Sequence, residues 1–120
     1  MKNIENLLIP ENITIKEALK NAGLKASDID YVEAHGIGNK FTDAIEIQSI
    51  NDGYADRNTP IYVGSVKANI GHLEAGTGMP MLFKITEIIR HKKIPAQINI
   101  TTLNEDVVFR TMVSSSSNFG

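Results

Sequence analysis

Two histidines stand beside glycines in the middle of this 120-residue chain. His35 begins the segment His-Gly-Ile-Gly-Asn-Lys, and His72 lies within Asn-Ile-Gly-His-Leu-Glu-Ala-Gly. Glycine beside a functional side chain indicates a sharp turn or a close approach of the backbone to a ligand, because only glycine adopts a positive φ without steric cost. Each histidine also follows a strand-like run. We therefore expect both imidazoles at one edge of one sheet, where open α/β sheets bind ligands.

Two imidazoles at that edge can converge on one small oxygen atom. Two neutral N–H donors aimed at such an atom would stabilise a developing enolate or oxyanion. Lys67 and Glu74 lie on either side of His72, and an ion pair between them would fix the second imidazole; the alternative is two solvated charges. For His35 taken alone, we give about equal weight to a ligand site and to an ordinary turn that happens to contain a histidine.

Other site chemistries have less support in the sequence. There is no His-Glu-x-x-His spacing, so no metal site is predicted. The run Gly76-Thr77-Gly78 lacks the third glycine of a dinucleotide fingerprint and the Gly-Lys-Ser/Thr end of a P-loop, so no nucleotide cofactor is predicted either. Cysteine is absent from these residues, which excludes disulfides, thiolate metal sites and cysteine nucleophiles within them.

The composition predicts one modest domain and excludes several classes of partner. The hydrophobic content is 42%, and twelve basic residues are scattered among fourteen acidic ones for a net charge of −2. This mixed charge gives no basic patch that would bind nucleic acid or an anionic membrane. No apolar run approaches the roughly 18 residues of a membrane span, and Glu5 stands where a signal peptide would be apolar. We expect a cytoplasmic protein.

The elements that position the first histidine follow from capping and periodicity. Residues 1–13 form a lead-in segment, and the capping-box pattern of Thr14 predicts a helix that starts there and ends at Asn21 or Ala22, before a left-handed Gly23. A strand over Ile29–Ala34 then leads into His35. A second helix is expected to be capped by Thr42 or Asp43 and to end at Asn51-Asp52-Gly53.

The second histidine follows a strand predicted over Ile61–Val66, whose apolar run suits a strand covered on both faces. A third helix is expected from about Gly78, with Met81, Leu82, Ile85, Ile88 and Ile89 on one face. Two strand-like pieces, Gln97–Ile100 and Val107–Val113, precede a serine-rich end. The order α-β-α-β-α-β-β predicts a layered α/β unit.

Three segments also resemble a known family. Tyr31–Asn39, Asp43–Glu46 and Gly64–Ala75 are similar to the C-terminal half of the β-ketoacyl synthase (ketosynthase) domains of modular polyketide synthases and fatty-acid synthases. The likeness runs from about Thr14 to about Leu103, with both histidine motifs in order and at a family-like separation. The resemblance implies one half of a thiolase-like fold, with a domain over residues 14–120 that is truncated in its C-terminal loop.

The resemblance also implies a reaction and a set of roles. Ketosynthases catalyse decarboxylative Claisen condensation of an acyl group held on a cysteine with a malonyl thioester carried by an acyl carrier protein. His35 and His72 would donate hydrogen bonds to the malonyl thioester oxygen, and Lys67 and Glu74 would support them. The run ending in Phe119 and Gly120 approaches the family's oxyanion loop. No bound cofactor is implied, since the substrates arrive on phosphopantetheine arms.

The sequence departs from the family in ways that bear on function. Threonine is usual where Ile37 and Asn39 stand, so two locally bonding hydroxyls are expected to be lost. Proline is usual where Ala44 stands, and Gly76-Thr77 replaces a run of small alanines. The N-terminal half with its cysteine is not within these residues, so we expect no condensation by this chain alone.

Three functions remain open at this level. The chain is a fragment or split part of a polyketide-type ketosynthase that pairs with the N-terminal half, in a domain that is usually dimeric. Alternatively, it is a non-catalytic interaction module that binds an acyl carrier protein or a complete synthase. The third possibility is malonyl-thioester decarboxylation by His35 and His72 without condensation, which needs a formed pocket but no cysteine.

Overall fold

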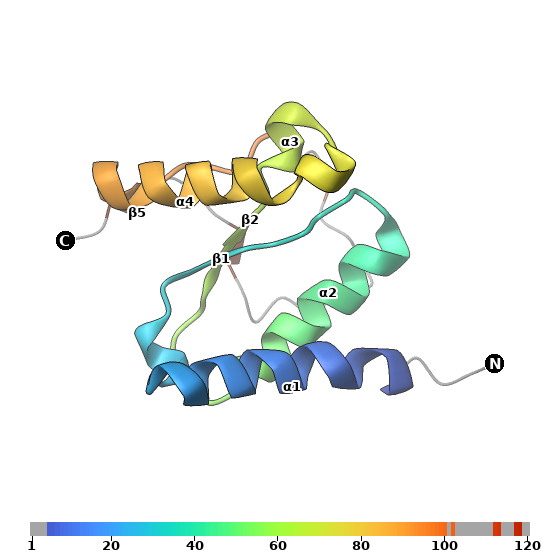
Figure 1. Cartoon of the computed structure of the whole chain (residues 1–120), viewed down its shortest axis with the longest axis vertical. Coiled ribbons are helices and arrows are strands. Elements are labelled where there is room, and N and C mark those ends of the chain that lie inside the picture. The colour runs from blue at the N-terminus through green and yellow to red at the C-terminus, as the bar shows by residue number, and fades with distance from the viewer. Residues whose placement is uncertain (1–4, 101, 103–111, 114–116, 119–120) are drawn as a thin grey trace.

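The computed structural model describes residues 5–100, 102, 112–113 and 117–118. Helices and short strands alternate along the described chain (Figure 1). In chain order the elements are α1 (Glu5–Ala22), the 3-10 helix η1 (Ala26–Asp28), β1 (Tyr31–Glu33), α2 (Lys40–Gly53), β2 (Tyr62–Gly64), α3 (Lys67–Ile70), the 3-10 helix η2 (Glu74–Gly76), α4 (Gly78–His91), β3 (Lys93–Ile94), β4 (Met112–Val113) and β5 (Ser117–Asn118).

The central sheet is parallel, with the strand order β1-β2-β4. Its register pairs Tyr31 with Tyr62 and Glu33 with Gly64, so β1 and β2 end at the same edge. A second, antiparallel pair joins β3 to β5. Figure 1 shows α1 and α2 on one side of β1 and β2, and α4 on the other. The predicted layered α/β arrangement is confirmed.

A small apolar core holds α2 against the sheet. Its buried members come from the end of β1, from α2 and from β2 and its lead-in, and they are Ala34, Ile50, Ile61 and Val63. Four partly buried side chains pack around them: Ile29, Val32, Ile47 and Tyr54. Burying one such aliphatic side chain contributes about 1.5–3 kcal/mol. The core therefore fixes the loop between β1 and α2, which carries His35.

The first helix begins earlier than the sequence pattern predicted. α1 already includes Glu5, so the predicted start at Thr14 is wrong. A threonine followed three residues later by a glutamate is also an ordinary i, i+3 pair on one helix face, and Thr14 lies inside the helix rather than at its cap. The end at Ala22 and the left-handed Gly23, with φ +67°, are confirmed.

The second helix is capped by Asn39, not by Thr42 or Asp43. The Asn39 Oδ1 atom accepts hydrogen bonds from the backbone N–H groups of Phe41 and Thr42, each at 3.0 Å. A side-chain amide oxygen is as good a cap as a hydroxyl, because both supply an acceptor to unpaired N–H groups of the first turn. The local bonding expected to be lost at Asn39 is therefore present.

The segment Gln97–Ile100 is not a strand in the structure, which corrects that prediction. Asn99 has φ +61°, a left-handed conformation that interrupts an extended chain. Of the predicted strand Val107–Val113, the described residues Met112–Val113 form β4, and the rest lies outside the described residues. The sequence patterns also did not predict β3, α3 or η2.

Helix α4 leaves much of its apolar surface open. Of the predicted apolar face, Ile88 is buried, whereas Leu82 and Ile89 are exposed. Four large apolar side chains on α4 are between 55% and 71% exposed, namely Met79, Leu82, Phe83 and Ile89. Over the part of the chain that the structure describes, no helix has both the length and the apolar content to cross a lipid bilayer.

Candidate functional site

The two histidine loops meet beyond the carboxyl ends of β1 and β2. His35 follows β1 by two residues, and His72 follows the short helix α3 that comes after β2. The two imidazole centroids lie 5.5 Å apart, with the ring planes at 88°. The prediction that the sheet edge brings both imidazoles together is confirmed by this contact.

The protonated nitrogen of His35 follows from its contact with Lys67. The Lys67 side chain lies in a residue that is only 8% exposed, and its Nζ atom stands 3.3 Å from Nδ1 of His35. An ammonium group can only donate hydrogen bonds, so Nδ1 must accept. The neutral imidazole then carries its hydrogen on Nε2, where it is a hydrogen-bond donor.

His72 is held in the same tautomer by different partners. The backbone N–H of Glu74 donates to Nδ1 of His72 at 3.1 Å, and the Thr77 hydroxyl lies 3.0 Å from the same nitrogen. A backbone N–H is a donor only, so Nδ1 of His72 also accepts and its hydrogen is on Nε2. Both imidazoles thus present one Nε2–H donor.

The predicted ion pair between Lys67 and Glu74 is wrong. Within the described ranges no ion pair joins these residues: Lys67 contacts His35, and Glu74 contacts His72 through its backbone. Glu74 has φ +48°, a left-handed backbone conformation. Both residues contact the histidines: Lys67 uses its ammonium group but contacts His35 rather than Glu74, and Glu74 contacts His72 through its backbone N–H rather than its carboxylate.

The loop that carries His35 is held by Glu46 of α2. The Glu46 carboxylate accepts hydrogen bonds from the backbone N–H of His35 at 2.5 Å and of Gly36 at 2.9 Å. Gly36 has φ +49°, and a Cβ atom there would lie 2.8 Å from Cβ of Ser65. Glycine is needed at this position both for the left-handed backbone and for the close approach to the neighbouring loop.

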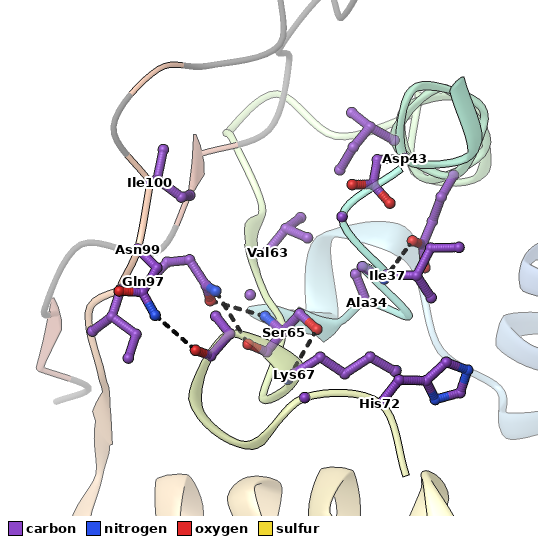
Figure 2. Close-up of a pocket in the computed structure, with 18 of the residues that line it drawn as sticks. Ala34, Ile37, Asp43, Val63, Ser65, Lys67, His72, Gln97, Asn99 and Ile100 are labelled. Carbon is purple, nitrogen blue, oxygen red and sulfur yellow. Dashed lines mark hydrogen bonds between the residues drawn. The ribbon is translucent and has the colours of Figure 1, made fainter. Parts of the chain in front are cut away.

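Two side-chain amides fix the loop after β2. Gln97 accepts from the backbone N–H of Ser65 at 2.9 Å and donates to the Ser65 carbonyl at 3.1 Å, which imitates the pairing of another strand. Asn99 donates to the Ala68 carbonyl at 2.8 Å. Figure 2 shows these amides reaching towards the loop that leads to Lys67. The segment predicted as a strand therefore pairs through its side chains.

A buried carboxylate ties α4 to the sheet beneath the histidines. The Glu33 side chain is 2% exposed, and it pairs with Lys84 Nζ of α4 at 2.9 Å. Glu33 also accepts from the backbone N–H of Val66 at 2.5 Å and from the Tyr31 hydroxyl. Burial, the hydrogen bond to Glu33 and the charge of Glu33 raise the pKa of Tyr31 well above its usual range.

A cavity of about 440 Å3 lies against the histidine loops. Polar groups of its wall include Lys67, His72 and Gln97, whereas Ile37 and Ile100 belong to its apolar wall (Figure 2). Apolar pockets with a few convergent polar groups are typical sites for small ligands and for the reactive ends of larger ones. Of the two imidazoles only that of His72 belongs to the cavity wall, to which the His35 loop contributes Gly36, Ile37 and Gly38.

Several residues of this site were not assigned a role from the sequence. Glu33 and Glu46 lay within the segments that carried the family resemblance, but their partners are far away in sequence. Gln97 and Thr77 carried no motif signal. Phe119 and Gly120, the predicted oxyanion-loop residues, lie outside the described residues.

Sequence comparison shows matches to much longer synthases. The profile of the family described as "Beta-ketoacyl synthase, C-terminal domain" matches residues 10–101. A highly reducing polyketide synthase of Alternaria alternata is 43% identical over 93 residues, which is 77% of this chain and 3% of that protein. An erythronolide synthase of Saccharopolyspora erythraea is 41% identical over 88 residues, which is 71% of this chain and 3% of that protein.

Solved ketosynthase structures have the same fold. Ketosynthase twelve of the bacillaene polyketide synthase of Bacillus amyloliquefaciens matches with a TM-score of 0.87 and 28% identity, over 94% of this chain and 21% of that one. The oxazolomycin ketosynthase domain of Streptomyces albus matches with a TM-score of 0.84 and 29% identity, over 92% of this chain and 21% of that one. The expected fold, part of a ketosynthase domain, is confirmed.

Proposed function

Since the chain belongs to the family of β-ketoacyl synthase C-terminal domains of polyketide synthases, we propose that it supplies the two-histidine side of a ketosynthase active centre. One observation carries the proposal. Donors at both Nδ1 atoms, from Lys67 for His35 and from Glu74 for His72, leave the hydrogen of each ring on Nε2, and the two rings lie 5.5 Å apart. Such a pair of donors stabilises an enolate without transferring a proton to it.

In the proposed reaction, a malonyl thioester enters the cavity with its carbonyl oxygen facing both Nε2–H groups. The bond between the malonyl α-carbon and its carboxylate breaks, CO2 leaves, and the electron pair forms the enolate. His35 and His72 donate hydrogen bonds to the enolate oxygen as its charge grows. The enolate carbon then attacks an acyl thioester on a cysteine, whose thiolate leaves.

The cysteine of this scheme must come from outside these 120 residues, which contain none. We assign it to the remainder of the ketosynthase. The exposed apolar face of α4, which includes Leu82, Phe83 and Ile89, is a suitable surface for that remainder because large apolar patches mark protein contacts. The substrates are proposed to arrive on the phosphopantetheine arm of an acyl carrier protein.

The proposal is tested by measuring CO2 release from malonyl acyl carrier protein, with the chain alone and mixed with a ketosynthase part that supplies the cysteine. His35→Ala and His72→Ala are each expected to lower the rate about 100-fold, since each removes one oxyanion donor. His91→Ala is the matched control. His91 is an exposed histidine at the end of α4 that pairs with Glu87, so its removal should leave the rate unchanged.

A non-catalytic interaction module would give a different result. Binding of the carrier protein would then survive the loss of both imidazoles, and CO2 release would be absent from the parent chain as well. Equal rates for the parent chain, His35→Ala and His72→Ala would contradict the catalytic proposal.

A further inference from the structure

Thr77 stands at the N-cap of α4, but its side chain does not cap the helix. Threonine is a favoured N-cap residue because its hydroxyl accepts a hydrogen bond from a backbone N–H of the first turn. No such bond is formed here, and Thr77 has helical dihedral angles of φ −56° and ψ −36°. Its hydroxyl oxygen lies instead 3.0 Å from Nδ1 of His72.

The direction of this hydrogen bond is fixed by the second partner of the same nitrogen. The Glu74 backbone N–H already donates to Nδ1 of His72 at 3.1 Å, so that nitrogen cannot carry a hydrogen. The Thr77 hydroxyl must therefore donate its hydrogen to Nδ1. Two donors converge on one acceptor: Glu74 is the first residue of η2, and Thr77 is both the C-cap of η2 and the N-cap of α4.

Glu74 alone is a weak support for the ring. Its φ of +48° is unfavourable for a residue with a side chain, and both His72 and Glu74 are exposed. The Thr77 hydroxyl connects the imidazole to the junction of η2 with the 14-residue helix α4, which is a more rigid support than the one-turn 3-10 helix alone.

We propose that Thr77 is a positioning residue that holds His72 in its Nε2–H tautomer and fixes the orientation of the ring. The inference rests on the proposed function, because the hydrogen on Nε2 matters only if a substrate oxygen accepts it. In return, the helix gives up its side-chain cap. Nothing in this role requires Thr77 to touch the substrate.

The test compares Thr77→Val with Thr77→Ser by 15N NMR of the histidine side chains. Valine keeps the shape of threonine but removes the hydroxyl, whereas serine keeps the hydroxyl. In Thr77→Val the His72 nitrogen shifts should move from the Nε2–H pattern towards an average of the two tautomers, and Thr77→Ser should resemble the parent. Thr86→Val is the matched control, because the Thr86 hydroxyl donates to the Leu82 carbonyl on the same helix and is remote from the ring.

Thermal unfolding of the same variants separates positioning from capping. If the hydroxyl capped α4, Thr77→Val would lower the melting temperature and leave the His72 shifts as they are; that result would overturn the proposal. Equal shifts for the valine and serine variants would overturn it as well.

Activity gives an independent reading of the same variants. CO2 release by Thr77→Val should fall about fivefold, the effect of one ordinary hydrogen bond, and Thr77→Ser should restore it. If the shifts change as described while the parent chain with its cysteine partner releases no CO2, Thr77 still positions His72 and it is the proposed function that fails.

Discussion

Gly36 is a position of the site at which the backbone leaves no room for a side chain. It combines a positive φ with a close approach to Ser65, and its N–H is bonded to Glu46. The loop that presents His35 therefore depends on the absence of a side chain here. The two glycines of that loop differ in this respect, because a Cβ atom at Gly38 would meet nothing within 4 Å although its φ is +81°.

This difference gives a prediction for two matched variants. Gly36→Ala and Gly38→Ala both place alanine in a left-handed conformation, but only Gly36→Ala adds a contact at 2.8 Å. We expect Gly36→Ala to lower the free energy of unfolding by about 2 kcal/mol more than Gly38→Ala does, the usual cost of overpacking. Urea denaturation of the two variants measures it, and equal losses would mean that the Ser65 loop moves aside freely.

At this scale the sequence predicted where the imidazoles lie but not how they are held. His35 and His72 each follow a strand, and parallel strands end at one edge, so their meeting could be predicted. Their tautomers could not, because they depend on contacts such as the one between Lys67 and His35, which are 32 residues apart. The Lys67–Glu74 pair was inferred from closeness in sequence, and the fold separates the two charges.

At the scale of elements, β1 carries a buried polar network as well as apolar residues. Tyr31 and Glu33 extend from this strand towards Lys84 of α4, and the Lys84 Nζ atom also lies 5.5 Å from the centre of the Tyr31 ring. Breaking a buried ion pair usually costs about 3–5 kcal/mol, whereas an exposed pair such as Arg90 with Glu87 contributes less than about 1 kcal/mol. The network therefore fixes α4 on the sheet.

The Tyr31 hydroxyl makes this network sensitive to alkaline pH. Its pKa is raised in the folded chain, mainly by burial, so above about pH 10 the unfolded chain loses this proton while the folded chain keeps it. The stabilisation by the neutral hydroxyl is complete below pH 10 and falls as the pH rises. The free energy of unfolding of the parent chain minus that of Tyr31→Phe should decrease by up to about 1.4 kcal/mol per pH unit.

Urea denaturation of both proteins between pH 8 and pH 11 measures this difference. Subtracting Tyr31→Phe removes the contribution of other groups, including Tyr54, whose pKa burial also raises. A difference that stays constant over this range would show that Tyr31 ionises equally in both states.

The elements themselves were predicted best where burial decides. The run Ile61–Val66 contains β2 because apolar residues suit a covered parallel strand, and its buried members Ile61 and Val63 belong to the core. Gln97–Ile100 shows the same alternation of polar and apolar residues as a strand, yet its amides bond to the neighbouring loop and Asn99 is left-handed. Alternation alone does not say whether a segment bonds through its backbone or its side chains.

At the scale of the whole molecule, the chain spans 3–5% of the length of the curated relatives it matches and about 21% of the solved ketosynthase chains. The open apolar side chains of α4 agree with a surface that another part of a synthase covers. Such a surface also favours association between copies of the chain when no partner is present.

The role of this surface in protein contacts can be tested by adding one charged side chain to it. Phe83 is 63% exposed, and Phe83→Asp should reduce self-association of the chain and weaken its binding to a cysteine-bearing ketosynthase part. Asn21→Asp adds the same charge to an exposed position of α1 and should change neither. Sedimentation velocity with and without the partner measures both effects. If the two variants behave alike, the open face of α4 is not the contact surface.

The anchoring of the two histidine loops has a mechanical consequence. The His35 loop is attached to α2 through Glu46, and His72 is attached to Thr77, the N-cap of α4. Helices α2 and α4 lie on opposite sides of the sheet (Figure 1). A shift of α4 along its axis would carry one imidazole and leave the other in place. The 5.5 Å distance between the ring centroids therefore depends on how α2 and α4 are aligned across the sheet. We expect a partner that shifts α4 along its axis by binding its exposed apolar side chains to change the distance between the two rings.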